Sequence, residues 1–205
     1  VRPASRLAEE AGLGVGDSGG IVTDPRMATS GEGIWAAGDC TEVFHRVSRR
    51  PVAIALGTHA NKQGRVAGVN ATGGDVTFPG VVGTAVTKFC EHEVARTGLT
   101  EREAREAGFR AVAAIIESTT RAGYYPESAP ITVKVVAEEE TGRLLGAQVI
   151  GREGAAKRID VLAVAIWNEM TATEFAGLDL GYAPPFSPVF DPTLVAAHQV
   201  SKLAG

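Results

Sequence analysis

One stretch in the second half of the chain, ITVKVVAEEETGRLLGAQVIG, constrains the fold more than any other part of the sequence. Its first six residues alternate, with Ile131, Val133 and Val135 on one face and Thr132 and Lys134 on the other. An apolar residue at every second position is typical of a half-buried strand. The polar EEETGR segment then turns the chain into a second apolar run. The stretch therefore predicts an antiparallel hairpin with one buried face.

The surrounding sequence predicts further strands and helices. VVGTAVTKF and RAVAAIIEST are expected strands, and Thr100 with Glu103 has the spacing of a capping box before a helix that ends at Gly108. Asp191 is expected to cap the final helix. EGAAKRIDVLAVAIWNEM is apolar on nearly all sides of a helix, which indicates burial on both sides and a subunit interface. These elements predict an α+β fold, with an antiparallel sheet and helices on one face.

The first part of the chain has a different character. A short helix is expected over residues 4–11 and a strand over residues 34–37, directly before Gly38 and Asp39. Residues 41–50 are polar and are expected to form a loop. Pro51 suits the first turn of a helix, which would continue to the Asn70–Gly74 segment. The change in character divides the chain into residues 1–75 and residues 76–205.

Composition excludes several classes of function. The net charge of −4 gives no electrostatic reason to expect a nucleic-acid or anionic membrane partner. No apolar run approaches the roughly 18 residues of a membrane-spanning helix. Cys40 and Cys90 are far apart and form no metal-binding pattern, so we expect free thiols, a cytoplasmic protein and no metal.

Asp39 is the first candidate for a ligand-binding residue. It follows the short apolar run IWAAG, and an ionised carboxylate there could either cap a helix or accept hydrogen bonds from a ligand. The stretch from Thr29 to Asp39 resembles the second flavin-binding motif of the FAD-dependent pyridine nucleotide-disulfide oxidoreductases. That resemblance implies that Gly38 and Asp39 bind FAD, with the carboxylate accepting hydrogen bonds from the ribityl hydroxyls.

The resemblance extends over essentially the whole chain. It implies that residues 1–75 are the C-terminal portion of a Rossmann-like FAD-binding domain and residues 76–205 a dimerisation domain. PVAIALGTHANKQGRVAG is similar to the family helix whose N-terminus points at the flavin. Pro51, Val52 and Ala53 are therefore expected to bind the cofactor, with backbone N–H groups near Pro51 and Val52 stabilising negative charge on the flavin ring.

The tail LDLGYAPPFSPVFDPTLVAA resembles the coenzyme A-disulfide reductase and NADH oxidase branch of this family. In that branch, tyrosines contributed across a homodimer act at the active site, and Tyr182 and Tyr124 match their positions. Tyr182 is also expected beside the FAD, and Asn61 is expected to contact the substrate. The alternatives are interface packing for each tyrosine and an ordinary helix surface position for Asn61. Phe190 departs from the branch, since a basic residue can occur in this tail.

The sequence therefore predicts the C-terminal segment of a flavoprotein that transfers electrons from NAD(P)H to a small disulfide-like substrate. The NAD(P)H site and the redox cysteine would lie upstream, so this segment alone is expected to be inactive. The substrate stays open between coenzyme A disulfide, a polysulfide and oxygen. The alternative function is a non-catalytic dimerisation or interaction module.

Overall fold

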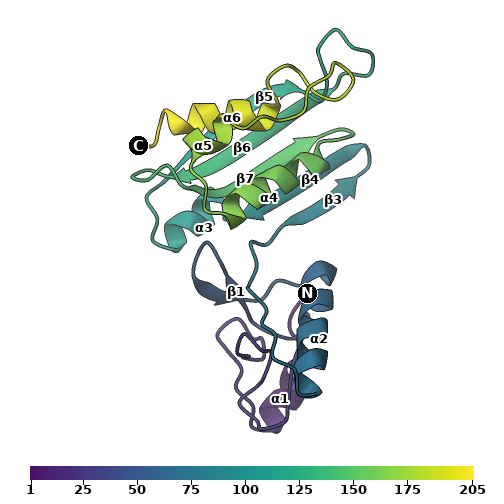
Figure 1. Cartoon of the computed structure of the whole chain (residues 1–205), viewed down its shortest axis with the longest axis vertical. Helices are drawn as coiled ribbons and strands as arrows, with labels where there is room; N and C mark the ends of the chain where they lie inside the picture. The colour runs from purple at the N-terminus through teal and green to yellow at the C-terminus, as the bar shows by residue number, and fades with distance from the viewer. The chain divides into compact units, whose positions relative to one another are not determined.

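The computed structural model describes all 205 residues, and the chain forms two compact units (Figure 1). The first unit comprises residues 1–81 and the second comprises residues 82–205. No helix in either unit combines the length and the apolar character that crossing a bilayer requires.

The first unit is built from few regular elements. They are α1 (Arg6–Glu10), β1 (Val43–His45), β2 (Arg50–Val52) and α2 (Gly57–Ala71). Strands β1 and β2 form an antiparallel ribbon that begins in the predicted loop over residues 41–50 and ends in the predicted start of the helix. Elsewhere single bridges hold the chain, such as the one between Ala28 and Trp35.

The predicted strand over residues 34–37 is wrong, because only Trp35 makes a bridge there. Gly33 and Gly38 flank this run with φ angles of 72° and 88°, which turn the backbone at both ends. The run pairs only with Met27–Thr29, through the bonds Thr29 N–H to Ile34 O and Ala36 N–H to Met27 O, and this pairing is too short for a ladder. The short apolar run therefore packs as irregular structure.

The predicted start of the helix at Pro51 is also wrong. Pro51 lies in β2 opposite Phe44, and α2 begins only at Gly57. Proline is tolerated in such a two-stranded ribbon because an edge strand does not need every N–H group for pairing. The end of α2 agrees better with the sequence, since Gly73 adopts a φ of 91° just beyond the last turn.

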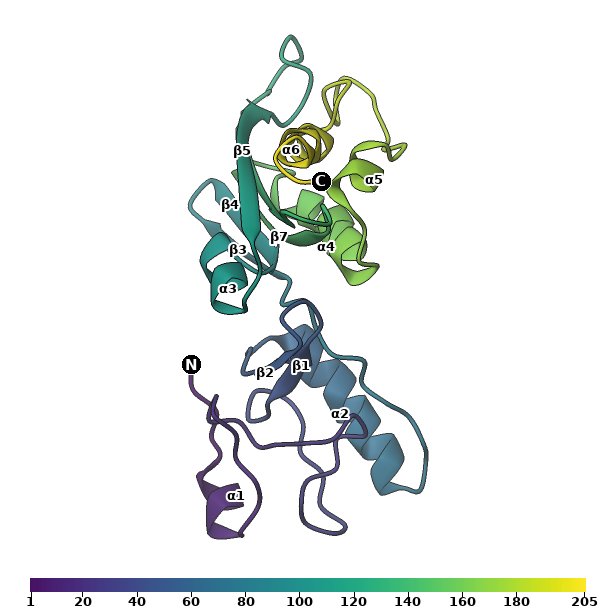
Figure 2. The same cartoon turned by 90° about the vertical axis from the view of Figure 1, so that its left-hand side faces the viewer.

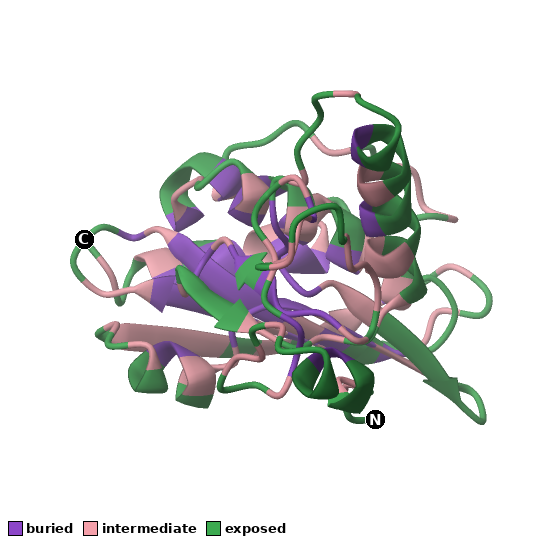
Figure 3. Cartoon of the chain, turned by 90° about the horizontal axis from the view of Figure 1, so that it is seen from below, coloured by how far each residue is buried: buried purple, intermediate pink, exposed green.

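The second unit contains a five-stranded antiparallel sheet with the order β3-β4-β7-β6-β5. The strands are β3 (Ala85–Phe89), β4 (His92–Gly98), β5 (Ala111–Thr119), β6 (Pro130–Glu138) and β7 (Leu144–Gly151). The predicted hairpin is confirmed as β6 and β7, with Val133 opposite Val149. Ile131, Val133 and Val135 are all buried, as their alternation predicted. Figure 3 shows the buried residues gathered along the strands of the sheet.

Helices α4 (Ile159–Trp167), α5 (Ala172–Ala176) and α6 (Pro192–Ser201) cover one face of this sheet (Figure 2). The predicted α+β class is thereby confirmed, and these three helices lie on one face as expected. The short α3 (Glu101–Glu106) lies on the opposite side, where Glu101 pairs with Lys134 of β6. A 3-10 turn over Ala156–Arg158 leads into α4.

The predicted caps of two helices are present. Thr100 and Glu103 form a reciprocal capping box at α3. The side chain of Asp191 accepts a hydrogen bond from the backbone N–H of Thr193 at the start of α6. The α4 helix buries Ile159 and its neighbours but leaves Val164 62% exposed, so only one of its sides is covered within the chain. The subunit interface stays a prediction.

Candidate functional site

The turn that carries Asp39 is fixed by hydrogen bonds around its glycine. Gly38 adopts a left-handed φ of 88°, and its N–H donates to Oε1 of Gln63 at 2.6 Å. The hydroxyl and the N–H of Thr41 both donate to the carbonyl of Gly38, at 2.8 and 3.0 Å. A side chain at position 38 would strain this backbone conformation. The turn is therefore held rigidly against α2, the helix that contains Gln63.

The carboxylate of Asp39 projects from this turn without a partner of its own. The residue is exposed, and its side chain accepts no hydrogen bond from the chain. An ionisable side chain nearby is His59 of α2, whose pKa the negative charge of Asp39 acts to raise. The alternative that Asp39 caps a helix is excluded by the structure, because α2 begins at Gly57 after Leu56. This carboxylate is available to hydroxyl donors of a ligand.

Two polar side chains of α2 near this turn have buried atoms that lack a hydrogen-bond partner. Gln63 is 1% exposed, and its Nε2 donates to nothing, whereas its Oε1 holds Gly38. His59 has an unpartnered Nδ1. Burial lowers the pKa of His59 despite an opposing hydrogen bond to the backbone of Ile54, so its imidazole is neutral at pH 7. Unsatisfied buried polar atoms are uncommon and call for an explanation such as a ligand.

The N-terminus of α2 lies in the same region of the first unit. The carbonyl of Leu56 accepts the N–H groups of His59 and Ala60, while Leu56 provides no side-chain cap for the N–H groups of Gly57 and Thr58. An uncapped helix N-terminus favours negative charge or a hydrogen-bond acceptor. This end of the helix follows the predicted flavin-binding residues rather than including them.

The predicted residues of the first unit thus occupy three different settings. Pro51 and Val52 lie in β2, and Ala53 lies in the extended segment that leads to α2. Asn61 is exposed on α2, two residues beyond His59. Gly38 and Asp39 lie in the turn that Gln63 holds to the same helix. The structure brings the turn and α2 together and places Pro51 and Val52 on the β ribbon instead.

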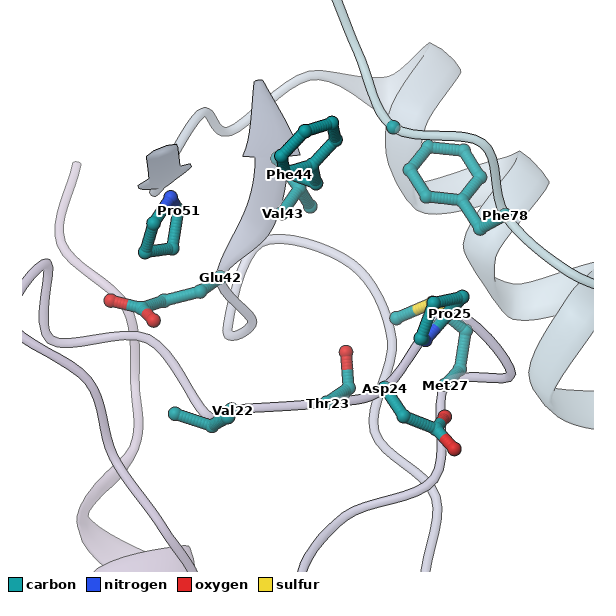
Figure 4. Close-up of a pocket in the computed structure, with 11 residues that line it drawn as sticks. Val22, Thr23, Asp24, Pro25, Met27, Glu42, Val43, Phe44, Pro51 and Phe78 are labelled. Atoms are coloured by element: carbon teal, nitrogen blue, oxygen red, sulfur yellow. The ribbon is translucent and has the colours of Figure 1, made fainter. Parts of the chain in front are cut away.

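The first unit also contains an open cavity of about 370 Å³. Its lining is largely apolar: Val22, Thr23, Asp24, Pro25, Met27, Glu42, Val43, Phe44, Pro51, Phe78 and Gly80. Figure 4 shows the carboxylates of Asp24 and Glu42 on opposite sides, pointing away from each other. Asp24 accepts the N–H groups of Arg26 and Ala28, and Glu42 accepts the N–H and hydroxyl of Ser18. Because these acids are already engaged, the cavity offers no converging polar groups for chemistry.

In the second unit, the structure brings the two predicted tyrosines together. The two residues are 58 positions apart in the sequence. Both side chains are solvent-accessible, with Tyr124 78% and Tyr182 48% exposed. Their loops are joined by a hydrogen bond from the N–H of Ala122 to the carbonyl of Pro184. A hydrogen bond with Tyr124 raises the pKa of the Tyr182 phenol above its ordinary value. The Tyr182 phenol is therefore protonated at neutral pH and can donate a proton or a hydrogen bond.

Gln63 and His59 were not among the site residues predicted from the sequence. HANKQG within a helix looks like a solvated face, and nothing in its spacing distinguishes a buried glutamine from an exposed one. The burial of Gln63 follows from the turn at Gly38, 25 residues earlier. Phe190, which stands in the tail where the branch can have a basic residue, is exposed.

Comparison with known proteins identifies the family. Residues 84–193 match the dimerisation domain of the pyridine nucleotide-disulphide oxidoreductases, and residues 1–64 match the pyridine nucleotide-disulphide oxidoreductase family itself. The chain belongs to the pyridine nucleotide-disulphide oxidoreductases. The predicted resemblance is confirmed.

Individual relatives extend the match over nearly the whole chain. An NAD(P)H coenzyme A polysulfide/persulfide reductase of Pyrococcus horikoshii is 44% identical over 198 residues, covering 97% of this chain and 44% of the relative. A coenzyme A disulfide reductase of Staphylococcus aureus is 28% identical over 186 residues, covering 90% and 42%. The structure of an NAD-dependent persulfide reductase from A. fulgidus superposes with a TM-score of 0.94 at 44% identity, covering 98% of this chain and 38% of that one. The chain thus spans less than half the length of these relatives.

Proposed function

We propose that this chain is the C-terminal part of an FAD-dependent oxidoreductase that uses NAD(P)H to reduce a coenzyme A-linked disulfide, persulfide or polysulfide. Residues 1–75 would supply one edge of the FAD site, and residues 76–205 would form the dimerisation domain. The observation that carries the proposal is the turn at Gly38 and Asp39. It presents a free carboxylate next to a helix that has unsatisfied polar atoms.

The residues of the first unit fit a flavin in their chemistry. Asp39 can accept hydrogen bonds from the hydroxyl groups of a ribityl chain, because an ionised carboxylate is an acceptor-only group. The N–H groups at the start of α2, near Gly57 and Thr58, suit the electron-rich carbonyl edge of the ring. Nε2 of Gln63 is a buried donor that still lacks an acceptor. When bound, FAD supplies the redox chemistry that links NAD(P)H to the substrate.

The tyrosine pair supplies the second part of the proposal. Two hydrogen-bonded phenols on exposed loops can orient a sulfur substrate and donate a proton to a leaving thiolate. In a homodimer, we place Tyr124 and Tyr182 at the substrate site of the partner subunit, and Asn61 on α2 is the candidate substrate contact of the first unit. The exposed phenyl ring of Phe190 favours a contact with the apolar part of the substrate over recognition of its phosphates. A cytoplasmic location stays a prediction.

The test uses the full-length protein encoded by the gene. We expect a flavin absorption band after purification and NAD(P)H oxidation that depends on coenzyme A disulfide or coenzyme A persulfide. Tyr182→Phe should slow the reduction of the sulfur substrate and leave flavin reduction by NAD(P)H unchanged, since the phenol acts only on the second half of the reaction. A full-length protein without bound flavin and without NAD(P)H-dependent turnover would instead support the non-catalytic dimerisation module.

A further inference from the structure

Arg158 lies beneath the two tyrosine loops and links them. Its side chain is only 11% exposed, although arginine is usually a surface residue. One terminal nitrogen, Nη2, donates to the carbonyl of Thr120 at 2.7 Å and to the carbonyl of Phe186 at 2.9 Å. Thr120 begins the loop that carries Tyr124, and Phe186 lies in the loop that carries Tyr182. A single nitrogen therefore joins both loops.

The rest of the guanidinium group fixes its own position. Nε donates to Oδ2 of Asp191 at 3.0 Å, and Nη1 donates to the carbonyl of Gly154 at 3.0 Å. The Asp191 side chain is 13% exposed and also accepts the hydroxyl of Ser187 at 3.2 Å. Its other oxygen caps α6 through Thr193. The tail loop is thus anchored at one end by this buried ion pair.

The geometry of arginine is required for this arrangement. Four acceptors surround the planar guanidinium: one carboxylate and three backbone carbonyls. A lysine carries the same charge on a single nitrogen, which cannot reach acceptors on opposite sides of the fork. Loss of the donors leaves the buried Thr120 carbonyl and the largely buried Asp191 carboxylate without this partner, and the loops can then separate.

We propose that Arg158 is a positioning residue that holds Tyr124 and Tyr182 in hydrogen-bonding contact for the reduction of the sulfur substrate. This inference rests on the proposed function as far as catalysis is concerned. Its structural part, the joining of the two loops, stands on the contacts alone. Arg158 itself touches neither tyrosine in the contacts that define its position, and it acts through the backbone of their loops.

The experiment compares Arg158→Lys and Arg158→Met with the control Arg110→Lys in the full-length protein. Arg110 is an exposed arginine of the same unit that pairs with Glu139 and Glu140 on the surface. Hydrogen–deuterium exchange should rise at least about tenfold in residues 120–128 and 182–190 of both Arg158 variants, because local opening governs exchange. Exchange in β6 and β7 should stay unchanged. The control should change neither.

Two further readouts separate positioning from general stability. Ultraviolet titration should show the phenol pKa of Tyr182 returning toward its ordinary value in Arg158→Lys. Reduction of coenzyme A persulfide should slow by at least about tenfold, a cost typical of displaced catalytic groups, while flavin reduction by NAD(P)H changes less than about twofold. If Arg158→Met fails to fold, Arg158→Lys decides the matter.

The inference is overturned if both loops keep their protection and the phenol titration is unchanged in Arg158→Lys. It is equally overturned if the sulfur reaction slows without any change in the loops, since Arg158 would then act in another way. Failure of the proposed function appears separately, as an unsubstituted protein that does not turn over. In that case the exchange and titration measurements still decide whether Arg158 joins the loops.

Discussion

Replacement of Asp39 by alanine is predicted to separate flavin binding from folding. The carboxylate is exposed and accepts no hydrogen bond within the chain, so its removal breaks no contact of the first unit. We therefore expect the free energy of unfolding to change by less than about 0.5 kcal/mol, as for other surface substitutions without a structural partner. If Asp39 binds the ribityl hydroxyls, its whole effect must appear in the affinity for FAD.

The size of that effect follows from the hydrogen bonds that a carboxylate makes. A hydrogen bond to a charged group contributes about 1.5–3 kcal/mol. Since about 1.4 kcal/mol corresponds to a factor of ten in affinity, the loss of one such bond weakens binding by roughly 10–150-fold. Asp39→Asn keeps an acceptor oxygen without the charge, so its affinity should lie between those of the unsubstituted protein and Asp39→Ala.

The assay is a fluorescence titration of the full-length apoprotein with FAD, combined with a thermal unfolding curve of each apoprotein. Glu32→Gln is the matched control, because Glu32 is another exposed acid of the same segment. It should alter neither quantity. FAD binding by Asp39→Ala within threefold of the unsubstituted protein would refute the assignment. A clear drop in the melting temperature of the apoprotein would also refute it, because the carboxylate would then be structural.

Three further predictions concern the second unit and α2. Tyr124→Phe should lower the phenol pKa of Tyr182 toward its ordinary value of about 10, seen by ultraviolet titration. Because the pKa of Tyr182 is raised in the folded protein, its hydrogen bond with Tyr124 stabilises the fold fully below the ordinary tyrosine pKa. This stabilisation is lost as the pH rises through the raised pKa of the folded protein. Gly146→Ala should cost more than about 4 kcal/mol in denaturant unfolding, because its Cβ would overlap the backbone oxygen of Leu99; near-normal stability would contradict this. Gly68→Ala has open space in α2 and should stabilise the first unit by about 0.5–1 kcal/mol, and a loss of stability would show the helix to be packed there.

The elements that the sequence predicted correctly are those whose information is local. The alternation of Ile131, Val133 and Val135 spans only five residues. It predicts the buried face of β6 without information from any other segment. The capping box of Thr100 and Glu103 is equally local, since both partners lie within one helical turn. Period and cap chemistry are therefore sufficient for most of the second unit.

The errors occur where distant segments decide the local structure. Proline is compatible with a first helical turn and with an edge strand, and only the pairing of Pro51 with Phe44 decides between them. The roles of Gln63 and Arg158 depend in the same way on remote partners. Arg158 meets acceptors that lie 38 positions before it, at Thr120, and 28 positions after it, at Phe186. Contacts between residues so far apart cannot be predicted from periodicity or from a local motif.

Several acidic side chains fix turns and helix ends of the chain, and Asp39 differs from them. Asp24, Glu42 and Asp191 each accept at least two hydrogen bonds within their own unit, and these bonds fix turns and helix ends. Asp39 accepts none, yet the backbone that presents it is held by the buried Gln63. The turn is ordered by the bonds of Gly38, Thr41 and Gln63, and none of them uses the carboxylate. A ligand is the partner that the proposed function gives to this carboxylate, and the titration with FAD tests that directly.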